Sequence, residues 1–265
     1  LSRSSCIVSV MNLTEFVVKS GACLSVNPDG TDKEFLHLYL SRVYEPLFQE
    51  IQPLKNFLEI GIGGGSSIKL WTEYLSLDRM VAIDAAPHFY FNLLDKNIEG
   101  TQLILGDAYS RSVVKTLQGN FDIIVDDGPH AYWSLKAAIR LYFPKLRPGG
   151  VMVVEDIPNI EDVLDRLLLC ANGESVCCFW LIDSRVDAKL KDDSVALVIH
   201  RKNGLCKLEF NKGVKVSSPK FNKSFKLKGL LLFERFLEIC NRKIYHGIKF
   251  RITRIKKRFL NKSLD

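Results

Sequence analysis

The stretch Phe57-Leu58-Glu59-Ile60-Gly61-Ile62-Gly63-Gly64-Gly65-Ser66 joins a short apolar run to a glycine-rich turn. The run over Asn56–Ile60 predicts a buried strand, and Ser66–Leu75 after the glycines predicts a helix. Glycines between a strand and a helix let the backbone turn sharply and approach a ligand closely. The stretch therefore predicts an α/β fold with a ligand near this turn.

The same alternation of apolar strands and helices continues along the chain. Helices are predicted at Ala131–Phe143 and around Ile160–Cys170, and a turn is predicted at Leu146–Gly150. Further strands are predicted at Met80–Ile83, Gln102–Leu105, Phe121–Val125, Val151–Val154, Ser175–Ile182 and Ser194–His200, with the last two close enough to form a hairpin. This order predicts a Rossmann-like, doubly wound, mostly parallel sheet of seven strands.

The 265 residues divide by composition into three parts. We expect an N-terminal helical segment at 1–52, a core domain at 53–205, and a basic, helical C-terminal extension at 206–265. Within the first part, Thr31 and Glu34 have the spacing of a capping box, which predicts a helix that runs through Phe48.

The net charge of +7 is concentrated at the C-terminal end of the chain. Residues 220–265 hold 14 basic and 3 acidic residues, a charge of +11, so the remainder carries −4. Three interpretations of this basic tail stay open: packing onto the core or a second subunit, peripheral contact with an anionic membrane, and nucleic-acid binding. Packing or oligomerisation is the most favoured of the three, and nucleic-acid binding is the least favoured, because the tail lacks an aromatic-interleaved motif.

No run of about 20 apolar residues predicts a membrane-spanning helix, and no basic segment leads into an apolar one as in a signal peptide. The seven cysteines lack metal-binding spacing, which predicts reduced thiols and a cytoplasmic protein.

Acidic residues follow all five predicted parallel strands. In parallel sheets, ligands bind beyond the carboxyl ends of the strands, so these residues predict a binding site there. They are Glu59, Asp84, Asp107, Asp126, Asp127, Glu155 and Asp156.

The first three strand ends favour S-adenosylmethionine over a dinucleotide. Ser66 stands where the dinucleotide pattern requires its third glycine, and Glu59 precedes the first glycine, where it can meet a cationic amino-acid group. Asp84 is suited to the ribose hydroxyls, and Asp107 with Ala108 to the adenine. The predicted cofactor-binding residues are Glu59, Gly61, Gly63, Gly64, Asp84, Asp107, Ala108 and Asp126.

The fourth and fifth strand ends favour a divalent metal. Asp126-Asp127 and Glu155-Asp156 follow neighbouring strands, and three carboxylates that converge there would make a hard oxygen site that suits Mg²⁺ or Mn²⁺. His130 lies three residues after Asp127, where a neutral imidazole can take a proton from a hydroxyl. These strand ends therefore predict a metal site, with His130 as a candidate base beside it.

These motifs resemble those of the metal-dependent macrolide-sugar O-methyltransferases, of the macrocin and mycinamicin type. The resemblance rests on Phe57–Gly64 with Trp71, the Asp126–His130 segment, the Leu146–Asp156 run, and Thr31-Asp32-Lys33 with later His and Tyr residues. It departs from the family pattern at Pro129. The resemblance implies methyl transfer from S-adenosylmethionine to a sugar hydroxyl, on a glycan or glycoside such as a deoxysugar. It also implies that Asp127, Glu155 and Asp156 are metal ligands, and that His130, as the base, and Asp127 are the catalytic residues.

Three other interpretations stay open. A related enzyme such as a hydroxylase can use the same scaffold, since fold does not fix function. A nucleic-acid methyltransferase could use the basic tail, although methylation of a base does not need the acid and histidine set. A non-catalytic binding module would have no need of the acids and His130.

Overall fold

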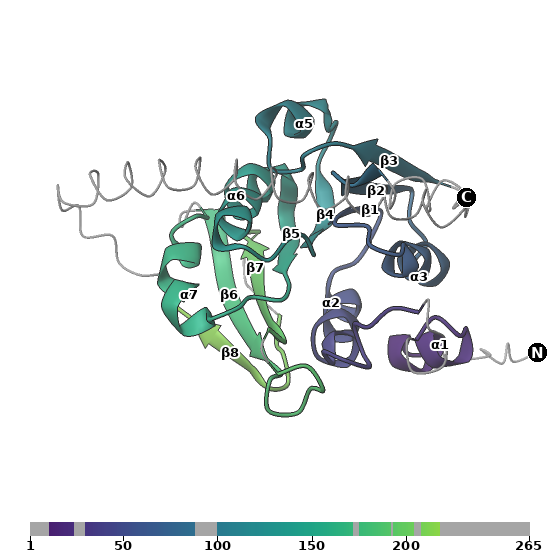
Figure 1. The fold of residues 1–265 in the computed structure, drawn as a ribbon. Helices are drawn as coiled ribbons and strands as arrows, with labels where there is room; N and C mark the ends of the chain where they lie inside the picture. The colour runs from purple at the N-terminus through teal and green to yellow at the C-terminus, as the bar shows by residue number, and fades with distance from the viewer. Residues whose placement is uncertain are drawn as a thin grey trace, which may run out of the picture. The chain divides into compact units, whose positions relative to one another are not determined.

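The computed structural model describes residues 11–23, 30–87, 100–171, 175–191, 193–203 and 208–217. They form one eight-stranded sheet in the order β3-β2-β1-β4-β5-β7-β6-β8 (Figure 1). The strands are β1 (Asn56–Ile60), β2 (Arg79–Asp84), β3 (Thr101–Leu105), β4 (Phe121–Asp126), β5 (Leu146–Val154), β6 (Val176–Asp183), β7 (Val195–Arg201) and β8 (Gly213–Val216).

The first five strands run parallel to one another, and β7 pairs antiparallel with both β5 and β6. The predicted Rossmann-like, mostly parallel sheet and its terminal hairpin are therefore confirmed. The predicted number of seven strands is wrong, because β8 adds an eighth strand antiparallel to β6. β8 also lies beyond residue 205, where we expected the core domain to end.

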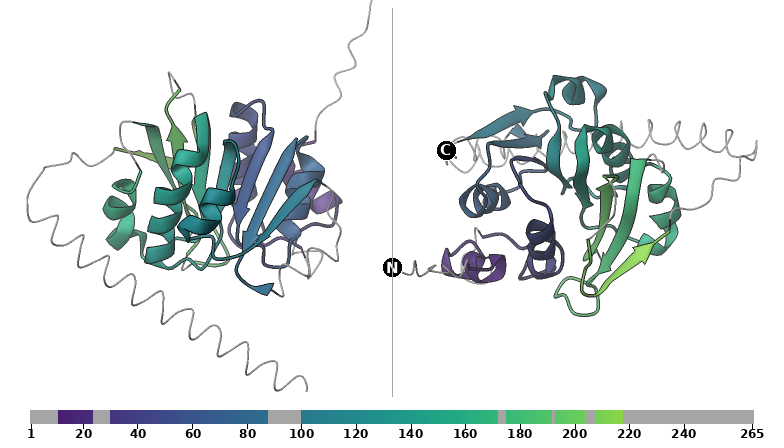
Figure 2. Two further views of the ribbon diagram at one scale, coloured as in Figure 1. Left: turned by 90° about the horizontal axis from the view of Figure 1, so that it is seen from above. Right: turned by 180° about the vertical axis from the view of Figure 1, so that it is seen from behind.

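Helices pack on both faces of this sheet. Helices α1, α2 and α3 cover one face, and α5, α6 and α7 cover the other (Figures 1 and 2). The α-helices are α1 (Leu13–Lys19), α2 (Glu45–Glu50), α3 (Ser66–Tyr74), α5 (Arg111–Thr116), α6 (Tyr132–Tyr142) and α7 (Ile160–Leu168), with a π-helix η1 (Leu40–Tyr44) and a 3₁₀ turn η2 (Phe143–Lys145).

Alternation along the strands assigns each strand residue to one of these faces. Phe57 of β1, Val125 of β4 and Val153 of β5 belong to the same core cluster as Trp71 of α3 and Leu47 of α2. The residue two positions after each of these strand residues projects to the same face. That rule places Glu59, Asp127 and Glu155 together beneath the N-terminal helices, whereas Asp126 belongs to the opposite face.

The N-terminal segment departs from the predicted helix. Residues 33–37 form turns, Leu38 has a left-handed φ of 62°, and regular helix begins only with η1. The Thr31 hydroxyl oxygen accepts from the Lys33 backbone N–H at 3.4 Å, and the Glu34 carboxylate accepts from the Ser41 N–H at 2.9 Å. The predicted capping box is therefore wrong, and the chain bends where a continuous helix was expected.

Three smaller expectations can also be compared with the structure. Leu146–Gly150, predicted as a turn, forms the start of β5.

Cys178 is disulfide-bonded, so the prediction of reduced thiols is wrong for that residue. In the part of the chain that the structure describes, no helix combines the length and apolar character needed to cross a bilayer. The basic tail at 220–265 lies outside the described residues.

Candidate functional site

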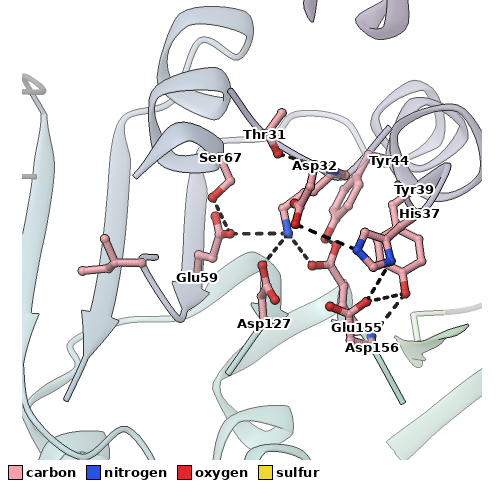
Figure 3. Close-up of polar contacts among 12 residues, drawn as sticks. Thr31, Asp32, His37, Tyr39, Tyr44, Glu59, Ser67, Asp127, Glu155 and Asp156 are labelled. Carbon is pink, nitrogen blue, oxygen red and sulfur yellow. Dashed lines mark hydrogen bonds and ion pairs between the residues drawn. The ribbon is translucent and has the colours of Figure 1, made fainter. Parts of the chain in front are cut away.

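A buried lysine lies at the centre of the acidic strand ends. The Lys33 ammonium contacts the carboxylates of Asp127 (2.8 Å) and Glu155, and lies 3.7 Å from that of Glu59 (Figure 3). Lys33 is only 2% exposed. Burying one charge without a partner is costly, so this cluster is stable only as a set in which the cation offsets several carboxylates.

The shared charges shift the titration of the whole cluster. Burial opposes the charge on Lys33, but Asp127 and Glu155 more than compensate and raise its pKa well above the ordinary value. Burial likewise opposes the charge on Asp127, yet Lys33 holds the pKa of that carboxyl below its usual range. Burial raises the pKa of Glu155, whose carboxylate also accepts from the Tyr44 hydroxyl at 2.5 Å. Lys33 therefore remains protonated beside an ionised Asp127.

Glu59 lies inside the protein beneath the glycine turn. It is fully buried, and its oxygens accept from the Ser67 hydroxyl at 2.8 Å and the Trp71 indole N–H at 2.7 Å. Burial raises its pKa to about 7. The structure thus places Glu59 where it bonds two side chains of α3 and lies close to Lys33. The predicted interaction of Glu59 with a cofactor amino group, through water or neighbouring groups, stays a prediction.

The glycine turn is open at one position and crowded at another. Gly61 has φ 92°, and a Cβ there would lie 1.9 Å from the Asp127 carbonyl oxygen. Gly63 also has a positive φ, of 51°, but a Cβ there would have no atom within 4 Å, and Gly64 has only the Ser66 hydroxyl at 3.8 Å. Gly61 therefore packs the turn against β4, while Gly63 and Gly64 border open space.

The other predicted cofactor residues divide between the turn and the protein interior. Asp84 accepts from the backbone N–H of Ile62 (2.9 Å) and of Ala86 (2.6 Å), which ties the glycine turn to the end of β2. Asp107 accepts from the Tyr109 N–H at 2.9 Å in the loop after β3. Both carboxylates lie at the strand ends where the sequence placed them.

Two of the predicted cofactor residues are buried. Asp126 is 1% exposed and accepts from the Tyr109 hydroxyl at 2.7 Å. Ala108 is 4% exposed, and its carbonyl accepts from the Tyr142 hydroxyl at 2.7 Å. The Asp126 side chain thus packs on the face opposite Asp127, and the structure does not bring its carboxylate to the glycine turn.

Asp127, His130 and Asp156 converge at the carboxyl ends of β4 and β5. One ligand atom from each lies within 4.8 Å of the others, which is close enough for one metal ion to contact all three. His130 Nε2 lies 3.7 Å from Asp127 Oδ1 and 3.8 Å from Asp156 Oδ2. Glu155 is not in this group, because its carboxylate turns toward Lys33 and Tyr44.

The conformation of this triad is strained. His130 and Asp156 both have left-handed backbone φ angles, of 53° and 51°. Such angles cost free energy in residues with a side chain and persist where the surrounding structure enforces them. Burial and the nearby Asp127 carboxylate raise the pKa of Asp156 to about 7. His130 Nδ1 is buried and has no partner among the described residues, so Nε2 alone faces the two carboxylates.

The sequence left three residues of this site without a role. Lys33, His37 and Tyr39 belong to the segment predicted as a plain helix, yet all three are buried against the strand ends. The available signal was the Thr-Asp-Lys motif with its later His and Tyr residues, which was used only as a mark of resemblance. His37 also forms a group with Asp156 and Asp193 whose ligand atoms lie within 4.8 Å.

The family model described as "Methyltransferase domain" matches residues 58–157. This range contains the glycine turn, Asp84, Asp107, the Asp127–His130–Asp156 group and Glu155. It ends before β6, β7 and β8, and it begins after the segment that carries Lys33 and Tyr39.

Curated relatives confirm the resemblance found in the sequence. An 8-demethyl-8-(2-methoxy-alpha-L-rhamnosyl)-tetracenomycin-C 3'-O-methyltransferase of Streptomyces olivaceus is 34% identical over 137 residues, which cover 48% of this chain and 34% of that protein. The mycinamicin VI 2''-O-methyltransferase of Micromonospora griseorubida is 29% identical over 132 residues, 46% of this chain and 32% of that protein. The chain thus spans about a third of the length of these curated relatives.

A solved structure is similar to part of this chain. The MycE methyltransferase from the mycinamycin biosynthetic pathway, in complex with Mg and SAH, aligns with a TM-score of 0.43 and 24% identity. The alignment covers 55% of this chain and 37% of that one.

Proposed function

We propose that this chain is an S-adenosylmethionine-dependent O-methyltransferase that acts on a sugar hydroxyl with the help of a divalent metal ion. The observation that carries the proposal is the convergence of Asp127, His130 and Asp156 beside a glycine turn. Both features lie within the residues that match a methyltransferase domain.

The cofactor site that we propose lies over the glycine turn. Gly63 and Gly64 border open space, so a ligand can approach the backbone there. Asp84 at the end of β2 is in place for the ribose hydroxyls, and Asp107 with Ala108 for the adenine. Glu59 supports the turn from below through Ser67 and Trp71.

The donor set of the second site fits a hard divalent cation such as Mg²⁺ or Mn²⁺. Asp127 and Asp156 each direct one carboxylate oxygen toward His130, and oxygen ligands are those that such cations prefer. Burial, together with repulsion between these two close carboxylates, raises the pKa of Asp156. Glu155 would be a third ligand if its carboxylate also reached the cation while bonded to Lys33 and Tyr44.

In the proposed reaction, the cation, His130 and Asp127 have separate roles. A divalent cation bound there would lower the pKa of an acceptor hydroxyl, fix its position and bind a neighbouring hydroxyl of the same sugar. His130 Nε2 takes the hydroxyl proton as the oxygen forms a bond to the methyl carbon of S-adenosylmethionine. The carbon–sulfur bond breaks, and S-adenosylhomocysteine is the product. Asp127 holds the imidazole and the acceptor side by side.

The proposed acceptor class follows from the curated relatives. Their names specify methylation of a rhamnosyl group, of mycinamicin VI and of demethylmacrocin. A deoxysugar with neighbouring hydroxyls, carried on a glycoside or glycan, is the acceptor that we propose here. Among the described residues, we find no feature that specifically favours hydroxylation or nucleic-acid methylation.

The test starts with binding and ends with turnover. Calorimetric titration of S-adenosylmethionine and S-adenosylhomocysteine, first with Mg²⁺ and then with EDTA, should give micromolar affinities. Transfer of a labelled methyl group should then be screened against rhamnosides and other deoxysugar glycosides. His130→Ala should lower turnover by about 10²–10⁴-fold, as expected for the loss of a general base, while cofactor affinity stays within a few-fold. Absence of cofactor binding in either condition would overturn the proposal.

A further inference from the structure

Asp127 and Asp156 are each held in the same way by the turn segment Thr31–Tyr39. Lys33 Nζ binds Asp127 Oδ2 at 2.8 Å, and the Tyr39 hydroxyl donates to Asp156 Oδ1 at 2.8 Å. The opposite oxygens, Asp127 Oδ1 and Asp156 Oδ2, face His130 Nε2 at 3.7 and 3.8 Å. The segment therefore engages one oxygen of each carboxylate and leaves the other facing His130. Figure 3 shows the contact between Tyr39 and Asp156.

The contact between Tyr39 and Asp156 is reciprocal. The Tyr39 hydroxyl also accepts from the Asp156 backbone N–H at 3.2 Å, so it binds both the main chain and the side chain of that residue. Asp156 has the left-handed φ of 51°, which an aspartate adopts at a cost. A hydroxyl that bridges the two groups offsets this cost and fixes the rotamer of the carboxylate.

Tyr39 is itself held rigidly. Its side chain is 1% exposed, and its ring stacks on His37 with the ring centroids 5.2 Å apart. His37 Nδ1 lies 3.0 Å from the Ser194 hydroxyl and 3.4 Å from the same Asp156 Oδ1 that Tyr39 binds. The Tyr39 backbone N–H donates to the Lys33 carbonyl at 2.5 Å, which links the two holding residues to each other.

We propose that Tyr39 is a positioning residue for Asp156, which it presents to a divalent cation through Oδ2 alone. This inference rests on the proposed function, because it assumes that Asp156 binds the metal. Partners that orient metal ligands commonly contribute 10–100-fold to metal affinity. The Tyr39 hydroxyl bonds Asp156 and the Asp193 carbonyl oxygen, so its loss should act on metal binding and spare cofactor binding.

Tyr39→Phe removes the hydroxyl and keeps the stacked ring. Mn²⁺ affinity should be measured by electron paramagnetic resonance, and Mg²⁺ and S-adenosylhomocysteine affinities by calorimetry, on the full chain. We expect metal affinity to fall by about tenfold or more, with S-adenosylhomocysteine affinity within about threefold of wild type. In turnover assays, the metal concentration for half activation should rise, while kcat at saturating metal recovers. Tyr74→Phe is the matched control, since within the described part of the chain the Tyr74 hydroxyl donates to the Met11 carbonyl at 3.4 Å and to no carboxylate of the proposed metal site.

Two outcomes would overturn the inference. The first is a folded Tyr39→Phe protein with metal affinity within twofold of wild type. The second is an equal loss of metal affinity when Tyr39→Phe is added to Asp156→Asn, because a residue that acts through Asp156 has no effect once that carboxylate is gone. If the wild-type protein binds S-adenosylhomocysteine but no metal, the metal part of the proposed function fails together with this inference. A failure confined to the variant leaves the proposed function in place.

Discussion

The indole N–H of Trp71 donates to Glu59 Oε2 at 2.7 Å, so the acid that precedes the glycine turn is directed into α3 and away from the turn's open side. Ser67 of the same helix donates to the other oxygen at 2.8 Å. Glu59 thereby fixes the angle between β1 and α3, the two elements that the glycine turn joins. We therefore expect Glu59 to affect cofactor binding indirectly, by holding β1 and α3 in place on either side of the glycine turn.

Trp71→Phe should destabilise the protein because it leaves a buried carboxylate oxygen without its donor. Trp180→Phe is the matched control, since the Trp180 indole N–H has no hydrogen-bond partner among the described residues. Both changes shrink a buried ring, and their difference in unfolding free energy should be about 1–3 kcal/mol. Denaturant unfolding measures this difference. Equal losses in the two variants would contradict the role given to the Trp71–Glu59 bond.

Gly61 and Gly63 should respond differently to the same substitution. Gly61→Ala places a Cβ 1.9 Å from the Asp127 carbonyl oxygen, so we expect loss of the folded protein. Gly63→Ala meets no atom within 4 Å and should cost about 1–2 kcal/mol for its left-handed backbone. Because its methyl group projects into the proposed cofactor site, S-adenosylhomocysteine affinity should fall at least tenfold. Thermal unfolding and calorimetry separate the two effects, and unchanged affinity in a folded Gly63→Ala protein would move the cofactor away from this turn.

Asp126→Asn should stabilise the protein at alkaline pH. Burial raises the pKa of Asp126 to about 7, whereas an unfolded aspartate titrates near 4. The folded state therefore keeps a proton that the unfolded state loses, and this group lowers stability as pH rises from about 4 to about 7. The amide avoids that cost and still accepts from Tyr109. We expect a gain on the order of 1–3 kcal/mol at pH 8.5 that disappears near pH 4, measured by denaturant unfolding. A gain of the same size at both pH values would mean that Asp126 is not the titrating group.

Mg²⁺ should raise the thermal unfolding midpoint of the protein, because a ligand that binds only the folded state stabilises it by mass action. The shift should grow with the logarithm of metal concentration and vanish with EDTA. Asp127→Asn removes one proposed ligand and should abolish the shift. Persistence of the full shift in that variant would place the stabilising ion elsewhere.

The sequence was most informative where local pattern decides structure. Short apolar runs bounded by glycine and acidic residues predicted β1 to β5 within about one residue in most cases, because buried parallel strands depend on apolar side chains at every position. The acidic residues at the strand ends could be found in the sequence because each one follows directly after an apolar run. What local pattern cannot supply is the face to which each acid points. Asp126 and Asp127 are adjacent in the sequence, yet one packs against Tyr109 and the other against Lys33.

The segment before the sheet was mispredicted because its stabilising contacts are distant in sequence. Amphipathic spacing through Phe48 favoured a helix. The carboxylates of Asp127, Glu155 and Asp156, which bond Lys33 and Tyr39, lie 94 to 122 residues further along the chain. Tertiary ion pairs and hydrogen bonds of this kind override local helix preference. The basic tail at 220–265 remains a prediction from composition.

The position of Lys33 limits how this protein can be truncated or used in domain exchange. The block that matches the family model, 58–157, supplies Glu59, Asp127 and Glu155 but not the cation that neutralises them. If residues 58–157 were expressed alone, these three carboxylates would lie close together without the Lys33 cation that offsets their charge. In a chimera, the Thr31–Tyr39 segment should therefore be transferred together with the 58–157 block.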